Sequence, residues 1–306
     1  MLCFTIPINA IIIDNVWLRG IDNCQYYKKL TLKTIIHTMQ QLITSLKQVL
    51  DTTDQLPFSV YSSVKEQRIL NVPIIKPLLI CVLDGCKKLG EGNETTCPAG
   101  SFVFLSNSAN VDMRNIPESS EYFALLIEFD FKDFDSFPST KANTQTFFQG
   151  PINSTFQQTL QQLVEWSTFA PAGMWPIRRQ EILQLIYYMG YEQVQSVMES
   201  PSLSHKLHSI FSADLSEDLH LDILSSKLAM SESTLRRKLK SEGTSLQMIK
   251  DRARLGHGLH LVQSTLQPIG RIAEQCGYQS QSRFTDKFKQ LFGITPTDLR
   301  KTRMPD

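Results

Sequence analysis

The last hundred residues contain one helical pattern twice, and this repetition constrains the fold more than any other feature of the sequence. In the first copy, residues 219–242, leucines recur three and four positions apart and predict two consecutive helices. Ala229-Met230 forms the corner between them, and the Ser231 hydroxyl is placed to cap the second helix by accepting a backbone N–H. The pattern predicts a helix-turn-helix unit with an apolar interior.

The second helix of this unit turns a polar and basic face outward. Leu235 and Leu239 are four residues apart and point inward. The outward positions are then Ser233, Arg236, Arg237 and Lys240. A helix with an apolar back and an arginine-rich front, entered through a tight turn, fits the major groove of DNA. A solvated surface helix carries the same residue types, so base contact by any one of these side chains stays open.

The second copy, residues 268–292, repeats this arrangement. Pro268 begins a helix at a position where its missing N–H has no partner to lose, and Gly277 suits the left-handed turn that follows. Ser280 can cap the next helix, and Phe284 and Phe288 point inward at helical spacing. The predicted DNA-facing side chains here are Gln281, Ser282, Arg283, Asp286 and Lys287.

A single connecting helix is predicted over residues 245–263, between the two copies. Its nineteen residues give a length of roughly 28 Å, near the roughly 34 Å of one DNA turn. Two recognition helices with this separation would enter adjacent major grooves on one face of the duplex. The segment 204–303 also carries six more basic than acidic residues, which favours a polyanionic partner for this part of the chain.

The repeated unit resembles the signature of the AraC/XylS family of transcription regulators. The matching positions are Ile272-Ala273, Gly277-Tyr278, Ser280, Ser282, Phe284, Phe288-Lys289, Gly293 to Pro296 and Arg300. The resemblance covers residues 204–303 and implies a bipartite DNA-binding domain, in which the first unit is usually the more selective. It also implies double-stranded promoter DNA and RNA polymerase as partners.

The chain departs from the family pattern at three positions. Asp286 stands where a basic residue is usual, and Leu299 stands where an aromatic residue precedes the final arginine. Gly258 replaces an alanine of the connecting helix, and with Gly256 it is expected to loosen that helix by roughly 1 kcal/mol per glycine. Asp286 can accept from a cytosine amino group or repel phosphate, so both alternatives stay open for the second unit.

The residue pattern changes from helical spacing to short strand-like runs between residues 58 and 134. Short runs rich in β-branched and aromatic residues alternate there with turns such as Asp84-Gly85, and they predict a small barrel or sandwich. Residues 30–134 resemble the cupin-like β-barrel of certain AraC-type N-terminal domains, which in that family senses a ligand or mediates dimerisation. The expected fold class is therefore α+β: a cupin-like barrel with flanking helices, followed by an all-α domain with the two helix-turn-helix units.

Helical spacing flanks the predicted barrel on both sides. Residues 32–49 carry one apolar stripe, which we interpret as a helix packed on its own domain, with a short coiled coil between subunits as the alternative. Residues 155–198 predict two further helices, whose apolar stripes suit either the core or a dimer interface. We expect an N-terminal sensing or dimerisation domain over residues 1–200 and the DNA-binding domain over residues 204–303.

Catalysis is not expected. No histidine lies between residues 38 and 204, so the predicted barrel has no imidazole to ligate a metal. The six cysteines form no CxxC pair and fit buried thiols in a reducing cytosol. A GxSxG nucleophile elbow is absent as well. We expect no enzyme activity, no metal and no cofactor.

An effector cannot be named from the sequence. Lys87, Lys88 and Arg114 could bind a carboxylate, but scattered surface charges are the commoner explanation of such residues. Apolar side chains of the barrel would suit either a fatty ligand or an ordinary core: Leu79, Phe102, Phe104 and Phe123. The effector-binding residues are therefore left unassigned.

Together these features predict a cytoplasmic, sequence-specific DNA-binding transcription regulator, an activator rather than a repressor. Its N-terminal domain would sense a small molecule or form a homodimer. The alternative is a ligand-independent DNA binder controlled through protein contacts of that domain. No apolar run reaches the roughly 18–20 residues needed to cross a bilayer, so no membrane association is expected.

Overall fold

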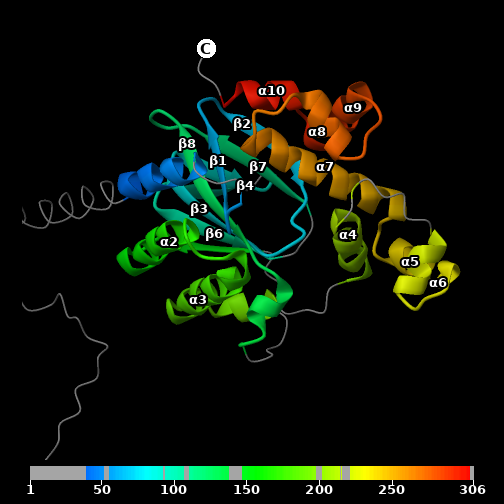
Figure 1. Ribbon diagram of the computed structural model, residues 1–306, viewed down its shortest axis with the longest axis horizontal. Helices are drawn as coiled ribbons and strands as arrows, with labels where there is room; N and C mark the ends of the chain where they lie inside the picture. Colours follow the sequence, from blue (N-terminus) through cyan, green and yellow to red (C-terminus); the bar gives the residue numbers. More distant parts are fainter. Residues whose placement is uncertain are drawn as a thin grey trace, which may run out of the picture.

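The computed structural model describes residues 39–51, 55–91, 94–106, 110–137, 147–197, 202–213, 215 and 221–303 (Figure 1). Along the chain, an N-terminal domain built on two β-sheets precedes a C-terminal domain made of helices. This order confirms the fold class predicted from the sequence. The predictions for residues 32–38 and 219–220 lie outside the described residues.

The N-terminal domain contains a five-stranded and a four-stranded antiparallel sheet. The first contains, in spatial order, β1 (Ser59–Ser63), β8 (Tyr122–Glu128), β3 (Leu78–Asp84), β6 (Ser101–Leu105) and β9 (Phe147–Pro151). The second contains β2 (Gln67–Val72), β7 (Val111–Ile116), β4 (Cys86–Leu89) and β5 (Thr95–Pro98). Among the described residues no strand pairs across the two sheets, so they form an open sandwich where a cupin-like barrel was expected. Helices of the C-terminal domain contact the edge strands β1 and β2.

The two faces of the five-stranded sheet belong to different cores, because successive side chains of a strand point to opposite faces. In β3, Leu79 and Cys81 pack against helices, whereas Ile80 and Val82 point toward the four-stranded sheet. The covering helices are residues 39–50, α2 (Ser154–Ser167) and α3 (Trp175–Tyr188). The helix at residues 39–50 buries its apolar stripe there, which agrees with its interpretation as a helix packed on its own domain.

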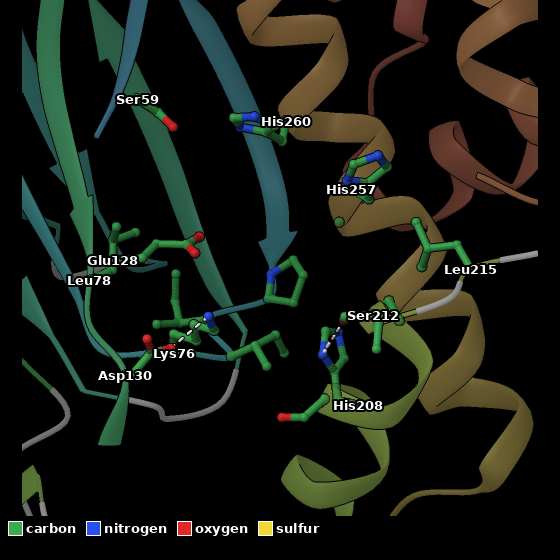
Figure 2. A pocket seen from close by; sticks show the side chains of 17 residues that line it. Ser59, Lys76, Leu78, Glu128, Asp130, His208, Ser212, Leu215, His257 and His260 are labelled. Carbon is green, nitrogen blue, oxygen red and sulfur yellow. Dashed lines mark hydrogen bonds and ion pairs between the residues drawn. The ribbon is translucent and has the colours of Figure 1, made fainter. Parts of the chain in front are cut away.

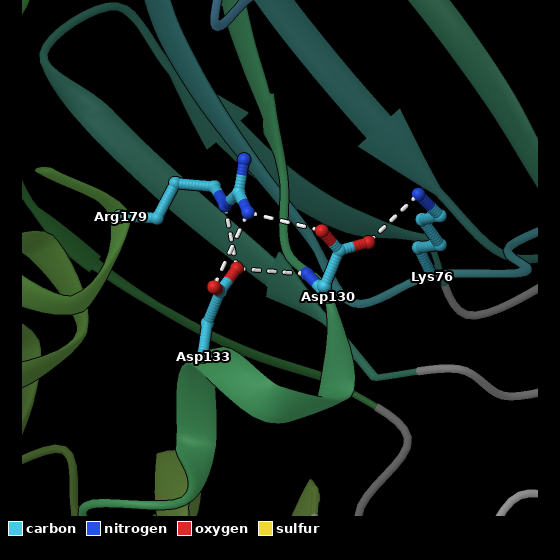
Figure 3. Close-up of polar contacts among 4 residues, drawn as sticks. All are labelled: Lys76, Asp130, Asp133 and Arg179. Atoms are coloured by element: carbon cyan, nitrogen blue, oxygen red, sulfur yellow. Dashed lines mark hydrogen bonds and ion pairs between the residues drawn. The ribbon is translucent and has the colours of Figure 1, made fainter. Parts of the chain in front are cut away.

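A partly buried ion cluster joins α3 to the end of β8 (Figure 3). The short 3-10 helix η1 (Phe131–Phe134) follows β8 and carries Asp133, which is fully buried. Arg179 of α3 donates to Asp133 at 3.2 Å and to Asp130 at 3.0 Å, and Lys76 donates to Asp130 at 2.9 Å. A buried carboxylate without such partners would be strongly destabilising. These four residues therefore neutralise one another's charges.

A row of buried polar side chains crosses the four-stranded sheet. Lys87 on β4, Asn115 on β7 and Gln67 on β2 occupy directly paired positions. The Lys87 ammonium donates to Asn115 Oδ1 at 2.7 Å, and the Asn115 amide donates to Gln67 Oε1 at 2.8 Å. The Gln67 amide then donates to the Thr302 hydroxyl at 2.7 Å. We call these four residues the polar rung; it connects the sandwich to the end of the C-terminal domain.

The C-terminal domain contains two helical cores that share one long helix. Its helices are α4 (Leu203–Ala213), α5 (Leu221–Lys227), α6 (Glu232–Ser241), α7 (Leu246–Ser264), α8 (Ile269–Gln275), α9 (Gln281–Phe292) and α10 (Pro296–Lys301). The first core lies between α4, α5, α6 and the start of α7, and the second between the rest of α7, α8, α9 and α10. Within the described part of the chain, no helix is both long and apolar enough to span a membrane.

Strand β2 docks the second helical core onto the sandwich. Ile69 of β2 is 2% exposed and is itself a member of that core. Asn71 donates from its side-chain amide to the Leu291 carbonyl at 3.1 Å, and the Val64 N–H donates to the Thr302 carbonyl at 2.8 Å. The second unit is therefore packed and hydrogen-bonded to the N-terminal domain.

Candidate nucleic-acid interface

Helix α6 has the buried back and open front that the sequence predicts for a recognition helix. Ser231 caps it by accepting the Thr234 N–H at 3.3 Å, and Leu235 and Leu239 are buried in the first core. Four predicted DNA-facing side chains are all exposed: Ser233, Arg236, Arg237 and Lys240. The Arg236 guanidinium lies 3.8 Å from Glu232 and stays 72% exposed, so this distant pairing leaves it available.

Helix α9 is the corresponding helix of the second unit. Ser280 caps it by accepting the Arg283 N–H at 3.3 Å, and Phe284, Phe288 and Phe292 are buried on its inner side. Four of the five predicted DNA-facing side chains are exposed: Gln281, Ser282, Arg283 and Asp286. The Asp286 carboxylate is presented outward with them, so its negative charge belongs to the surface that would meet DNA.

Lys287 differs from the other predicted side chains of α9. Its ammonium lies 3.4 Å from the Asp251 carboxylate on α7, and it is only partly exposed. Position 287 follows the buried Phe284 by three residues and therefore lies on the flank of the inner face. Lys287 thus faces the connecting helix, and the structure does not group it with the outward side chains.

The two units turn their corners with different residues. Gly277 takes a φ of +73°, and a Cβ there would lie 2.5 Å from the Leu215 carbonyl oxygen. The Arg254 guanidinium donates to this same carbonyl at 3.0 Å, which leaves no room for a side chain at 277. In the first unit Ala229 takes a φ of +50°, a conformation that costs a residue with a Cβ. The first corner is therefore the more strained of the two.

The structure explains why position 258 is a glycine, which the sequence alone did not. A Cβ at this position would lie 2.7 Å from the Phe284 ring and 3.3 Å from the Cys276 thiol. Helix α7 continues through Gly256 and Gly258 without interruption. Gly258 therefore admits the Phe284 ring against the connecting helix, and the expectation of a helix that is merely loosened was incomplete. Leu299, the other departure toward a smaller residue, is fully buried in the second core.

Two exposed basic side chains were not singled out from the sequence. Lys238 is exposed on α6 next to Arg237, and Lys289 is exposed in the last turn of α9. Lysines on a recognition helix commonly contact phosphate, which positions the protein without reading sequence. Their exposure could have been predicted from the sequence, because both positions lie outside the apolar spacing of Leu235–Leu239 and Phe284–Phe288.

Helix α7 joins the two recognition helices and sets their separation. It contributes Ile249 and Ala253 to the first core, and Leu255, Leu259 and Val262 to the second. In Figure 1 α5 and α6 lie beyond one end of α7, whereas α8 and α9 lie alongside α7, and all four are away from α2 and α3. Among the described residues, no group of three histidine, cysteine or acidic side chains is arranged to hold a metal ion.

Comparison with known proteins agrees with this geometry in the C-terminal domain. A family model described as a helix-turn-helix domain matches residues 224–302. Over 94 residues, 31% of this chain, the sequence is 33% identical to the HTH-type transcriptional regulator AdiY of Escherichia coli. Over 95 residues it is 35% identical to the porin thermoregulatory protein EnvY of the same species. The matching segment spans 37% of AdiY and 38% of EnvY.

Solved structures show the fold of a larger part of the chain. The structure is similar to that of an apo ToxT variant from Vibrio cholerae, with a TM-score of 0.62 over 82% of this chain and 99% of ToxT. It is also similar to wild-type ToxT bound to an unsaturated fatty acid, with a TM-score of 0.59 over 81% of this chain and 95% of ToxT. The sequence identities are 16% and 15%, so these similarities concern the fold.

Proposed function

Because the C-terminal domain of this chain is a helix-turn-helix DNA-binding domain of the AraC/XylS family, we propose that the protein is a sequence-specific transcription activator that reads two adjacent major grooves. The observation that carries the proposal is the pair α6 and α9, each capped, apolar at the back and polar in front, and both anchored on α7. The basic side chains would neutralise phosphates and release counterions, which makes the affinity salt-dependent.

Footprinting tests the two-groove proposal directly. Mapping of bound sites across the genome at native expression would first return the DNA motif. Hydroxyl-radical footprinting on that motif should then show two protected half-sites about 10 base pairs apart on one face of the duplex. A footprint confined to a single groove would contradict simultaneous reading by α6 and α9.

We also propose a homodimer formed through an apolar surface of the N-terminal domain. Phe169 and Ile177 are 75% and 55% exposed, and Met174 is exposed between them on the segment that joins α2 to α3. Large apolar side chains exposed close together in the sequence suit a protein interface. The domain boundaries that we propose, residues 1–200 and 204–303, leave this surface on the sensing domain and far from α6 and α9 along the chain.

Charge placed in this surface should dissociate the dimer. The Phe169→Asp variant is expected to sediment as a monomer at concentrations at which the wild type is a dimer, with a dissociation constant raised at least about tenfold. Leu266→Asp is the matched control, because Leu266 is 69% exposed on the C-terminal domain. Equal sedimentation of wild type and Phe169→Asp would exclude this surface as the interface.

The three basic side chains considered as partners of an acidic effector already have partners within the protein. ToxT has been solved with an unsaturated fatty acid, whose carboxylate would call for a cation in this chain. Lys87 is buried in the polar rung, Lys88 lies 3.3 Å from Glu94, and Arg114 pairs with both Glu66 and Glu94. These contacts argue against carboxylate binding by the three residues.

We propose that the N-terminal domain senses a small molecule, in preference to the ligand-independent alternative. The supporting observation is a large cavity bounded by both domains, because a ligand there would contact the sensing and the DNA-reading parts together. RNA polymerase and promoter DNA are the proposed macromolecular partners, and the cytoplasm is the proposed location, since the chain must reach DNA.

A further inference from the structure

A cavity of about 680 Å³ lies between the sandwich and the C-terminal domain (Figure 2). One wall comes from β1, β8 and the segment 73–78, and the other from α4 and α7. This volume falls within the range of roughly 300–1,000 Å³ that holds small-molecule ligands. A ligand in it would touch both domains at once.

Into this cavity Glu128 brings a carboxylate without an ion-pair partner in the part of the chain that the structure describes. It is the last residue of β8, and its carboxylate points toward α4 and α7 in Figure 2. The lining also contains the cation of Lys76, but this ammonium is bound to Asp130 at 2.9 Å. Among the described residues, no cation lies within ion-pair distance of Glu128. Desolvation raises the pKa of the Glu128 carboxyl, and the Lys76 ammonium offsets only part of this effect.

Three imidazoles face the carboxylate from the opposite wall. His208 comes from α4, and His257 and His260 come from α7. Desolvation lowers the pKa of each, that of His208 to about 4, so they are uncharged at neutral pH. These three rings therefore supply no positive charge to balance Glu128.

Neutral imidazoles are instead acceptors for a bound donor. His260 Nδ1 lies 3.1 Å from the Tyr61 hydroxyl, and His208 Nδ1 lies 3.1 Å from the Ser212 hydroxyl. With the proton on Nδ1, the Nε2 lone pair of each ring is left to accept a hydrogen bond. The Nε2 atom of His208, a residue that is 9% exposed, has no hydrogen-bond partner in the structure.

We propose that this cavity binds an organic cation, a primary ammonium or guanidinium group on a compact apolar body. Glu128 would provide the counter-charge, and His208 and His260 would accept hydrogen bonds from the cationic head. The apolar body would lie against Ile74 and Leu78 of the same cavity. If the chain is the regulator proposed above, such a ligand is its effector, because its binding energy would depend on how the two domains are placed.

Calorimetry on the full chain with three matched probes tests this proposal. Cyclohexylmethylamine carries the cation, cyclohexylmethanol has the same shape without charge, and cyclohexanecarboxylate carries the opposite charge. At pH 7.5 only the amine should bind. Glu128→Gln should weaken amine binding at least about tenfold, because a hydrogen bond to a charged partner is lost. The exposed Glu118→Gln is the matched control and should bind like the wild type.

Two results of the amine titrations would overturn the site, in addition to a failure of every probe to bind. One is equal binding of the amine and the alcohol, and the other is an unchanged amine affinity in Glu128→Gln. Circular dichroism checks that this variant folds, which is expected since an amide replaces a carboxylate that burial already disfavours. The test is independent of DNA: loss of amine binding in Glu128→Gln supports the site even in a protein that binds no DNA. If the protein protects its DNA motif but binds none of the probes, the proposed ligand site is wrong and the proposed DNA-binding function still stands.

Discussion

Replacing Arg237 with alanine should weaken binding to the cognate DNA site by roughly 1–3 kcal/mol and binding to random DNA much less. Arg237 is exposed on the outward face of α6, with Leu235 and Leu239 buried behind it. An arginine in this position can donate two hydrogen bonds to a guanine edge, and only that contact depends on sequence. Fluorescence anisotropy with cognate and scrambled duplexes, at one salt concentration, measures both affinities.

Arg271→Ala is the matched control for the loss of one positive charge. Arg271 is 74% exposed on α8, which is not a recognition helix, and pairs with Glu274 at 3.3 Å. Its removal should lower the affinity for both duplexes slightly and equally. If Arg237→Ala also lowers both affinities equally, Arg237 contacts phosphate and does not read a base.

Asn115→Ala should lower the free energy of unfolding of the N-terminal domain by about 3 kcal/mol. Asn115 is the middle of the polar rung and bonds both Lys87 and Gln67. Without it, the Lys87 ammonium, which is 3% exposed, loses its amide acceptor inside the sandwich. Urea denaturation followed by tryptophan fluorescence reports this, because Trp17, Trp166 and Trp175 all lie within residues 1–200.

A second variant identifies the cause of that loss. In a Lys87→Met background no buried ammonium remains, so Asn115→Ala should be less destabilising there than in the wild type. An equal effect in both backgrounds would mean that the packing of Asn115, and not its bond to Lys87, is responsible.

The same background predicts a pH dependence. Burial lowers the pKa of Lys87 to about 8, below that of an exposed lysine, about 10.4. Between these two values the unfolded chain binds more protons than the folded chain, so the contribution of Lys87 to the free energy of unfolding rises with pH. The difference between wild type and Lys87→Met should change over this window and stay constant below pH 8.

The sequence was sufficient for the features that depend on local periodicity. The spacing of leucines and phenylalanines, together with Ser231 and Ser280, predicted α6 and α9 and most of their exposed side chains, because a helix places each residue on a face by its position alone. The ion pair of Lys287 with Asp251 was not predicted, because Asp251 is 36 residues away in the chain. Gly258 was misread for the same reason, since its neighbour Phe284 belongs to another helix.

Pairing between distant segments explains the other differences. The sequence around Lys87 predicts a surface lysine. Only the registers of β4, β7 and β2 place it beside Asn115 and Gln67. The cavity lined by Glu128 depends on how α4 and α7 meet the sandwich. Neither arrangement has a signal in short stretches of sequence.

The docking of β2 restrains the recognition helix α9 more than the recognition helix α6. Moving α9 would require Ile69 to leave an apolar interior and the bonds to Leu291 and Thr302 to break. Over the described residues, no hydrogen bond joins the sandwich to α5 or α6. If a signal reaches the C-terminal domain, we therefore expect it to displace α6 more than α9, and a promoter would experience this as a preference for one half-site spacing over another.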